Sequence, residues 1–140
     1  GLLAEAQRAP EAWAGLPAGA QVGHVHLHVA DLDATAQFYH DVLGFETIFN
    51  LAEMGAAFFS AGGYHHHLGG NLWNGPGVPP APAEATGLRH FTLTLPDQDE
   101  VDRVAGRLRQ AGWALTPTEA GLLVRDPAQI GLVLTVGSAA

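Results

Sequence analysis

The sequence predicts an α+β fold built from two tandem βαβββ modules, and three observations support this prediction. The stretch HVHLHVADLD at 24–33 returns as HFTLTLPDQD at 90–99, 66 residues later, with a histidine, a leucine and both aspartates unchanged. In both copies an alternating strand pattern is followed by helical periodicity and then by three short strands with glycine-containing turns. A segment rich in proline, glycine and alanine, 74–86, separates the copies and is typical of a connector.

Module one is predicted to span 22–73. Alternation along 22–29 indicates a strand with three histidines on one face and aliphatic residues on the other. Asp31 or Asp33 then caps a helix over 34–43, which apolar side chains anchor to the sheet. Three more strands are expected at 45–51, 56–61 and 64–68.

Module two is predicted to span 87–136 and begins with the second copy of the repeat. The apolar stripe of 100–111 predicts an amphipathic helix. Residues 1–21 contain prolines and glycines that break periodicity, so they are expected to form a linker or N-terminal extension with a short helix at 2–8. The strands expected after the second helix are 113–116, 122–125 and 130–136.

The composition suits one compact domain and excludes several classes of site. The chain has 140 residues, 47% of them hydrophobic, with a formal net charge of -8 and arginine as its only basic residue. Clustered basic residues are missing, which argues against nucleic acid as a partner. Without cysteine there is no disulfide, thiolate site or cysteine nucleophile. No signal sequence or membrane span is evident in the sequence, so we expect a cytoplasmic protein with no membrane partner.

Each module opens with a histidine that is followed seven residues later by an aspartate, at His24 and Asp31 and again at His90 and Asp97. This pattern resembles the vicinal oxygen chelate superfamily, which includes glyoxalase I, extradiol dioxygenases and the fosfomycin- and bleomycin-resistance proteins. The resemblance extends from His24 to Val136. It is strongest to the C-terminal half of bacterial catechol 2,3-dioxygenase-like proteins, through GHVHLHVADLDATAQFYHDVLGF, SAGGYHHHLGGNLW, GLRHFTLTLPD and LLVRDP. It implies a curved mixed sheet around a cleft.

The resemblance also implies a metal site on the floor of that cleft. The ligand positions of the superfamily are the first residue of each first strand, His24 and His90, and a residue of each last strand, His67 and Val133. The repeat offset of 66 residues pairs the same two last-strand residues. We therefore expect His24, His67 and His90 as metal ligands. Val133 stands where a carboxylate is usual, so a three-histidine site suits zinc as well as Fe(II), with manganese, nickel or no metal left open.

Other polar and aromatic side chains are candidates for the cleft. Tyr64 is the candidate catalytic residue, as a general acid or hydrogen-bond donor toward a catecholate-like oxygen. Alternation along 64–67 would direct His65 and His67 to one face and His66 to the other. A polar patch on an edge strand is the structural interpretation of His65 and His66. Each of these residues also has a structural interpretation, as a packing or solvated side chain. The predicted cleft residues are His26, His28, His65, Asn71 and Trp73.

Three hypotheses about function follow. The first is a metal-dependent enzyme of the catechol 2,3-dioxygenase or glyoxalase type that acts on a small oxygen-chelating, catechol-like substrate. The second is a metal-free module that binds a small molecule, which Val133 favours. The third is a non-catalytic half of a larger dioxygenase. Unpaired sheet edges also lead us to expect a homodimer or pairing with a further N-terminal module pair.

Overall fold

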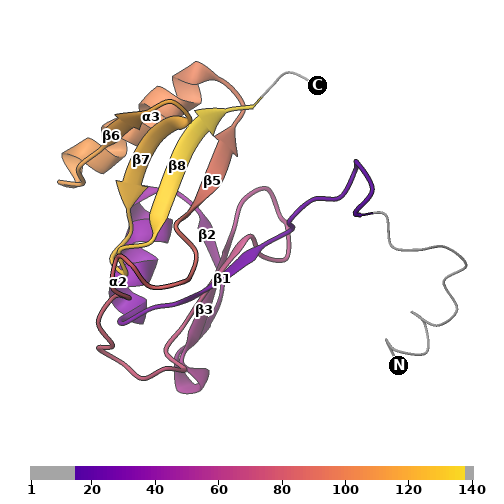
Figure 1. The fold of residues 1–140 in the computed structure, drawn as a ribbon. Coiled ribbons are helices and arrows are strands. Elements are labelled where there is room, and N and C mark those ends of the chain that lie inside the picture. The colour runs from indigo at the N-terminus through magenta and orange to yellow at the C-terminus, as the bar shows by residue number, and fades with distance from the viewer. Residues whose placement is uncertain (1–14, 138–140) are drawn as a thin grey trace, which may run out of the picture.

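The computed structural model describes residues 15–137, so the helix expected at 2–8 lies outside the described residues. The predicted α+β class is confirmed: the chain forms two four-stranded mixed sheets, each with a helical segment against it (Figure 1). In Figure 1 the first sheet lies below the second, and the connector runs upward between them to the start of the second module. None of the helices in the described part is long and apolar enough to cross a membrane.

The first sheet has the strand order β1-β4-β3-β2, with β1 parallel to β4 and the other neighbours antiparallel. After β1, the side chain of Asp31 accepts a hydrogen bond from the Ala34 backbone N–H and starts the helix. The helical structure begins at Leu32, before the predicted start at residue 34, and runs through α2 and a π-helical segment. The bounds are β1 (Val25–His28), α2 (Leu32–Ala36), the π-helical segment (Gln37–Val42), β2 (Glu46–Leu51), a 3₁₀ turn (Ala52–Met54), β3 (Ala56–Ser60) and β4 (Leu68–Asn71).

The prediction of the last strand of module one was wrong. Residues 64–67 belong to the loop after β3, and the strand begins at Leu68 and contains Gly69 and Gly70. A Cβ at Gly69 would lie 3.1 Å from the ring of His26, and one at Gly70 would lie 3.3 Å from Thr35. The two glycines therefore allow side chains from β1 and α2 to pack closely over both faces of β4.

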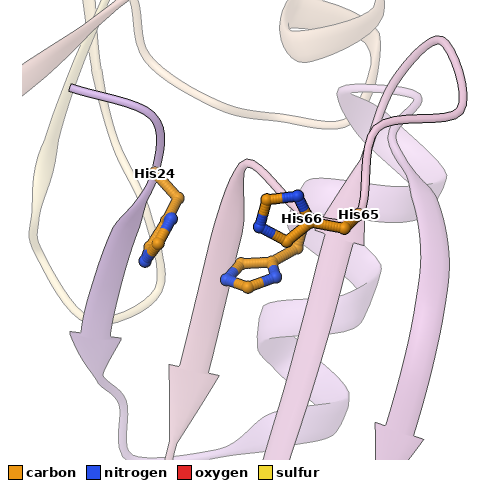
Figure 2. Close-up of side chains that lie close together, drawn as sticks. All are labelled: His24, His65 and His66. Carbon is orange, nitrogen blue, oxygen red and sulfur yellow. The ribbon is translucent and has the colours of Figure 1, made fainter. Parts of the chain in front are cut away.

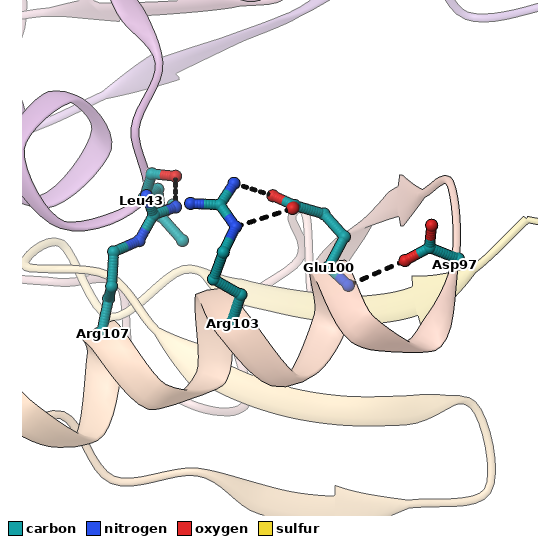
Figure 3. Close-up of polar contacts among 5 residues, drawn as sticks. All are labelled: Leu43, Asp97, Glu100, Arg103 and Arg107. Carbon is teal, nitrogen blue, oxygen red and sulfur yellow. Dashed lines mark hydrogen bonds and ion pairs between the residues drawn. The ribbon is translucent and has the colours of Figure 1, made fainter.

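The second sheet repeats this order as β5-β8-β7-β6, with β5 parallel to β8. Asp97 caps the helix by accepting from the Glu100 backbone N–H at 2.8 Å (Figure 3). The strand expected at 113–116 is displaced because Trp113 packs against Phe38, with ring centroids 4.7 Å apart. The bounds are β5 (His90–Leu95), α3 (Gln98–Gln110), β6 (Thr116–Thr118), β7 (Gly121–Arg125) and β8 (Gly131–Val136).

One apolar core joins the two modules. Helical residues of module one and α3 residues of module two meet between the sheets, so neither helix buries its apolar face on its own sheet alone. Phe38, Phe59 and Leu108 have no exposed surface. The buried core side chains of this cluster are Leu27, Val29, Phe38, Tyr39, Val42, Leu43, Phe45, Ala57, Phe59, Leu68, Val101, Val104, Leu108, Val124, Leu132 and Leu134.

Two polar contacts cross between the modules. The Tyr39 hydroxyl donates to Asp126 Oδ2 at 2.9 Å, and both residues are almost fully buried. The Arg107 guanidinium of α3 donates to the backbone oxygen of Leu43, at the end of the first helix (Figure 3). Asp126 also holds the turn between β7 and β8, because its side chain accepts a hydrogen bond from the Ile130 backbone N–H.

Burial sets the ionisation of the Tyr39–Asp126 pair. It raises the pKa of the Asp126 carboxyl, while hydrogen bonds from Ile130 and Tyr39 act in the opposite direction. Burial also raises the pKa of the Tyr39 hydroxyl, and the nearby Asp126 charge adds to that increase. Tyr39 therefore keeps its proton at neutral pH and donates it to the Asp126 carboxyl group.

We expect Tyr39→Phe to lower the free energy of unfolding by about 1–3 kcal/mol, because the mutation leaves a buried carboxylate oxygen without its donor. Urea unfolding at pH 7 measures the loss. Tyr64→Phe is the control, since Tyr64 is 40% exposed and the same atom is removed from a solvated position. An equal loss in both variants would contradict a specific role for the inter-module bond.

The raised pKa of Asp126 also predicts how stability depends on pH. The folded state holds the proton more tightly than the unfolded state, whose carboxyl titrates near 3.8, so this group's contribution is greatest at acid pH. It is lost as the pH rises through the folded pKa. The measurement is the difference in free energy of unfolding between the native protein and Asp126→Asn, taken from urea unfolding at a series of pH values. We expect this difference to fall as the pH rises from the unfolded to the folded pKa of Asp126. A difference that rises with pH would contradict the assignment.

Candidate functional site

The first strand presents its histidines on the face opposite the core, as predicted. Leu27 is buried on the core side, whereas His26 and His28 are exposed on the other side. The strand pairing places Gly69 beside His26, and Phe58 beside Gly69. These three positions form one row across the sheet, so the missing side chain at Gly69 leaves room over the middle of the row for the His26 ring.

An aromatic wall lies along this row. The His26 ring packs edge-on against Phe58 at a centroid distance of 5.6 Å and tilts over Trp73 at 5.3 Å. Trp73 is 64% exposed, and its backbone N–H donates to Asn71 Oδ1 at 3.1 Å. The predicted cleft residues His26, Asn71 and Trp73 are thus brought together on one face. Because Asn71 is buried, it orients Trp73 and is not open to a ligand.

Three imidazole rings converge at the upper end of the same face. Figure 2 shows His24, where the chain enters β1, facing His65 and His66 from the loop between β3 and β4. One ring nitrogen from each lies within 4.8 Å of the other two. Ring centroids are 4.5 Å apart for His24 and His66, 4.5 Å for His65 and His66, and 6.1 Å for His24 and His65. We call these three residues the histidine cluster.

The histidine cluster fits a divalent metal ion by the chemistry of its donors. Two imidazole nitrogens that bind one tetrahedral ion at 2.0–2.1 Å lie about 3.4 Å apart, so the present spacing needs only small side-chain rotations. His24 and His65 are exposed and His66 is half-buried, which leaves them free to rotate. The pKa of His66 is lowered by desolvation and then by the neighbouring histidines, His24 first, which favours the neutral form that binds metal.

Desolvation and neighbouring histidines also affect His26. Its pKa is lowered by partial burial and by the charges of His24 and His28. A neutral His26 can present its ring to an aromatic or apolar group without the cost of removing an imidazolium from water.

The structure does not bring His67 and His90 into the histidine cluster. His67 Nδ1 lies 3.2 Å from the Ser60 hydroxyl and 3.3 Å from the Ala61 backbone nitrogen, so it holds the loop that carries His65 and His66. His90 begins β5 in the other sheet and is exposed. Within the described residues the predicted set of His24, His67 and His90 is not gathered within 4.8 Å.

The pairing of His67 with Val133 by the repeat offset is corrected by the strand register. The backbone N–H of Val25 donates to His67, which places His67 beside the start of β1. In module two the residue beside His90 is Gly131, and Val133 lies opposite Thr92. The reason is loop length: residues 61–67 connect β3 to β4, whereas the shorter segment 126–130 connects β7 to β8. Val133 is buried. Neither Gly131 nor Val133 has a side-chain atom that could bind a metal ion.

The candidate catalytic residue Tyr64 lies beside the histidine cluster. Its ring is 4.2 Å from that of His65 and 4.7 Å from that of His67, between centroids. Its hydroxyl would lie 3.3 Å from a Cβ built on Gly23, immediately before His24. The buried Ser60 hydroxyl donates to the Tyr64 backbone oxygen at 2.6 Å and so fixes this part of the loop.

Sequence reasoning missed His66 as a candidate ligand. It assumed that 64–67 is a strand, in which neighbouring side chains point apart, and this assumption sent His66 away from His65. In a loop, adjacent rings can turn to the same side, as they do here. The run of three histidines between glycines was the available signal, since glycines on both sides permit a loop as readily as a strand.

Comparison with known proteins agrees with this architecture. The family model described as Glyoxalase/Bleomycin resistance protein/Dioxygenase superfamily matches residues 21–128. A catechol-2,3-dioxygenase of Bacillus subtilis (strain 168) is 49% identical over 127 residues, which cover 91% of this chain and 44% of that protein. The chain therefore spans less than half the length of this relative.

Solved structures share the fold. The glyoxylase/bleomycin resistance protein/dioxygenase domain from Frankia sp. EAN1pec is 26% identical with a TM-score of 0.69, over 85% of this chain and 98% of that one. The lactoylglutathione lyase from Agrobacterium tumefaciens is 23% identical with a TM-score of 0.65, over 86% of this chain and 96% of that one.

We expect Ser60→Ala to lower the free energy of unfolding by about 1–3 kcal/mol, because the Tyr64 backbone oxygen and His67 lose a buried partner. Thr118→Val is the matched control, since Thr118 donates a similar bond from an exposed position and valine keeps its shape. Chemical unfolding of both variants measures the difference. Equal effects would show that the Ser60 bonds do not hold the loop.

Proposed function

Because the chain belongs to the glyoxalase/bleomycin resistance protein/dioxygenase superfamily, we propose that it performs metal-dependent chemistry on a small, oxygen-chelating, catechol-like substrate. The observation that carries this proposal is the convergence of His24, His65 and His66 within 4.8 Å. The identity shared with the Bacillus subtilis catechol-2,3-dioxygenase supports the substrate class.

His24, His65 and His66 would hold the metal ion through neutral imidazole nitrogens. Three imidazoles leave coordination positions open, and the bound ion would act as a Lewis acid toward the substrate oxygens. Fe(II) is the metal expected for a dioxygenase, and zinc, manganese and nickel also accept imidazole ligands.

The remaining residues of this face would bind and orient the substrate. His26, Phe58 and Trp73 present aromatic surface beside the histidine cluster, against which a planar catechol ring can stack. Tyr64 is close enough to His65 to direct its hydroxyl toward a substrate oxygen near the cluster, as a hydrogen-bond donor. His28 extends the same exposed face beyond His26.

One mutagenesis series distinguishes the two candidate sets of metal ligands. His65→Ala and His66→Ala should each weaken metal binding at least about tenfold if the histidine cluster holds the ion. His67→Ala and His90→Ala should do so if the set implied by the superfamily holds it. His24→Ala should weaken binding in either case, and His40→Ala, on the first helix, is the control.

The measurement is elemental analysis of tag-free protein after anaerobic reconstitution with Fe(II), and separately with zinc, manganese and nickel. Catechol turnover is then assayed on the loaded protein. One equivalent of metal that is lost in the His24, His65 and His66 variants alone supports the proposal. Stoichiometric metal that His66→Ala leaves unchanged contradicts the proposed ligands.

A metal-free binding module is the alternative, and module two favours it. Beside His90 stands Gly131, and Val133 is aliphatic, so this module adds a single imidazole to the exposed face. Protein that binds catechol with no stoichiometric metal, and does not turn it over after reconstitution, would support this alternative against the enzyme.

A further inference from the structure

A cavity lies between the connector and module two, and none of His24, His65 and His66 lines it. Its volume is about 1080 Å³, and its walls are the connector, the end of β1, the start of β5 and the turn between β7 and β8. In Figure 1 the connector is the rose segment that leaves the lower sheet and runs up to β5. Backbone bonds from Gly77 to Ala30 and from Ala85 to Pro82 help to hold it in place. We call this cavity the connector groove.

The connector groove collects positive charge in an acidic chain. The protein has a net charge of -8, with 14 acidic residues and six arginines. Three of the arginines lie on α3, whereas Arg89 and Arg125 both line the connector groove. His26, His28 and His90 line the groove as well, and none of its lining residues is acidic. The two guanidinium groups, which are always charged, therefore make the groove a favourable place for an anion.

Both guanidinium groups keep donors available for a ligand. Arg125 donates from Nη1 to the Gln129 backbone oxygen at 2.8 Å, and Arg89 donates from Nη1 to the Ala83 backbone oxygen. A guanidinium has five N–H donors, so most of them remain. Within residues 15–137 neither arginine forms an ion pair with a carboxylate.

The strand register leaves a gap between the side chains of His90 and Arg125. Gly131 of β8 pairs with His90 of β5 on one side and with Arg125 of β7 on the other. A Cβ at Gly131 would lie 2.7 Å from the Arg89 backbone oxygen, so this position cannot carry a side chain without a shift of the backbone. His90 and Arg125 thus stand on either side of a bare strand position, and Arg89 immediately precedes His90.

The rest of the wall is apolar. Val78 of the connector and Leu88, Leu123 and Ile130 of module two line the groove together with the connector prolines. Pockets of this size with apolar walls and a few convergent polar groups are typical of small-molecule sites. The ligand that suits both features has an anionic head and an apolar body.

We propose that the connector groove binds a small organic anion, a carboxylate or phosphate on an apolar body, through Arg89 and Arg125. Guanidinium groups bind both oxyanions through paired N–H donors, so the head-group chemistry is shared. The metal ion is not needed for this binding, because no residue of the histidine cluster lines the groove. His26 and His28 belong both to the groove and to the face proposed for the substrate, so Arg89 and Arg125 are the residues that distinguish the two sites.

Calorimetric titration of metal-free protein with benzoate, phenyl phosphate and inorganic phosphate tests the proposal. We expect the aromatic anions to bind and inorganic phosphate to bind more weakly, since it has no apolar body. Arg89→Gln and Arg125→Gln should each weaken binding about tenfold or more. The control is Arg109→Gln, at an exposed position of α3 outside the groove, which should leave binding unchanged.

Folding of each variant is checked by its thermal midpoint, and Arg125→Lys serves as a second variant. It keeps the charge but not the paired donors, so it should bind with intermediate affinity. Protein that binds none of the three probes, or that loses affinity equally in Arg109→Gln, overturns the proposal. Work in the presence of a chelator keeps this result separate from metal binding at the histidine cluster.

Discussion

The contact between the first helix and module two is the constraint on which the rest of the structure depends. Phe38 packs on Trp113, and Tyr39 donates to Asp126 inside one shared core. Each module has a four-stranded sheet and one helical segment, and a unit of this size buries too small a fraction of its surface to form a stable core alone. Because the cores merge, the relative position of the two sheets is set by packing and by a buried hydrogen bond with a defined direction.

This arrangement uses one face of each sheet for the core, and the candidate sites lie on the other. In module one the free face carries the histidine cluster and the aromatic wall. Glycine has a particular part in it, because Gly69 lets the His26 ring lie flat over the sheet. In module two Gly131 leaves space beside His90, so the two modules share a fold but offer different chemistry.

Much of the fold could be predicted because the repeat and the alternation of apolar and polar residues are visible in the sequence without knowledge of tertiary contacts. The two modules and the exposed face of the first strand could be predicted in this way, and the structure confirms them. The sequence left the helix cap open between Asp31 and Asp33, and the structure selects Asp31. The errors have a physical cause as well. Gly69 and Gly70 indicate a turn when only local preference is considered, yet close packing of His26 and Thr35 makes them strand residues.

By itself, the sequence determined which chemistry the chain can carry: imidazole in excess, no thiolate, and two related modules that place a histidine at the start of each first strand. Only the tertiary structure decided which histidines meet. A strand directs adjacent side chains apart, whereas the loop before β4 lets His65 and His66 turn together toward His24. The shorter loop before β8 likewise sets Gly131, and not Val133, beside His90. Loop conformation and strand register depend on contacts between distant residues, which no repeat offset can encode.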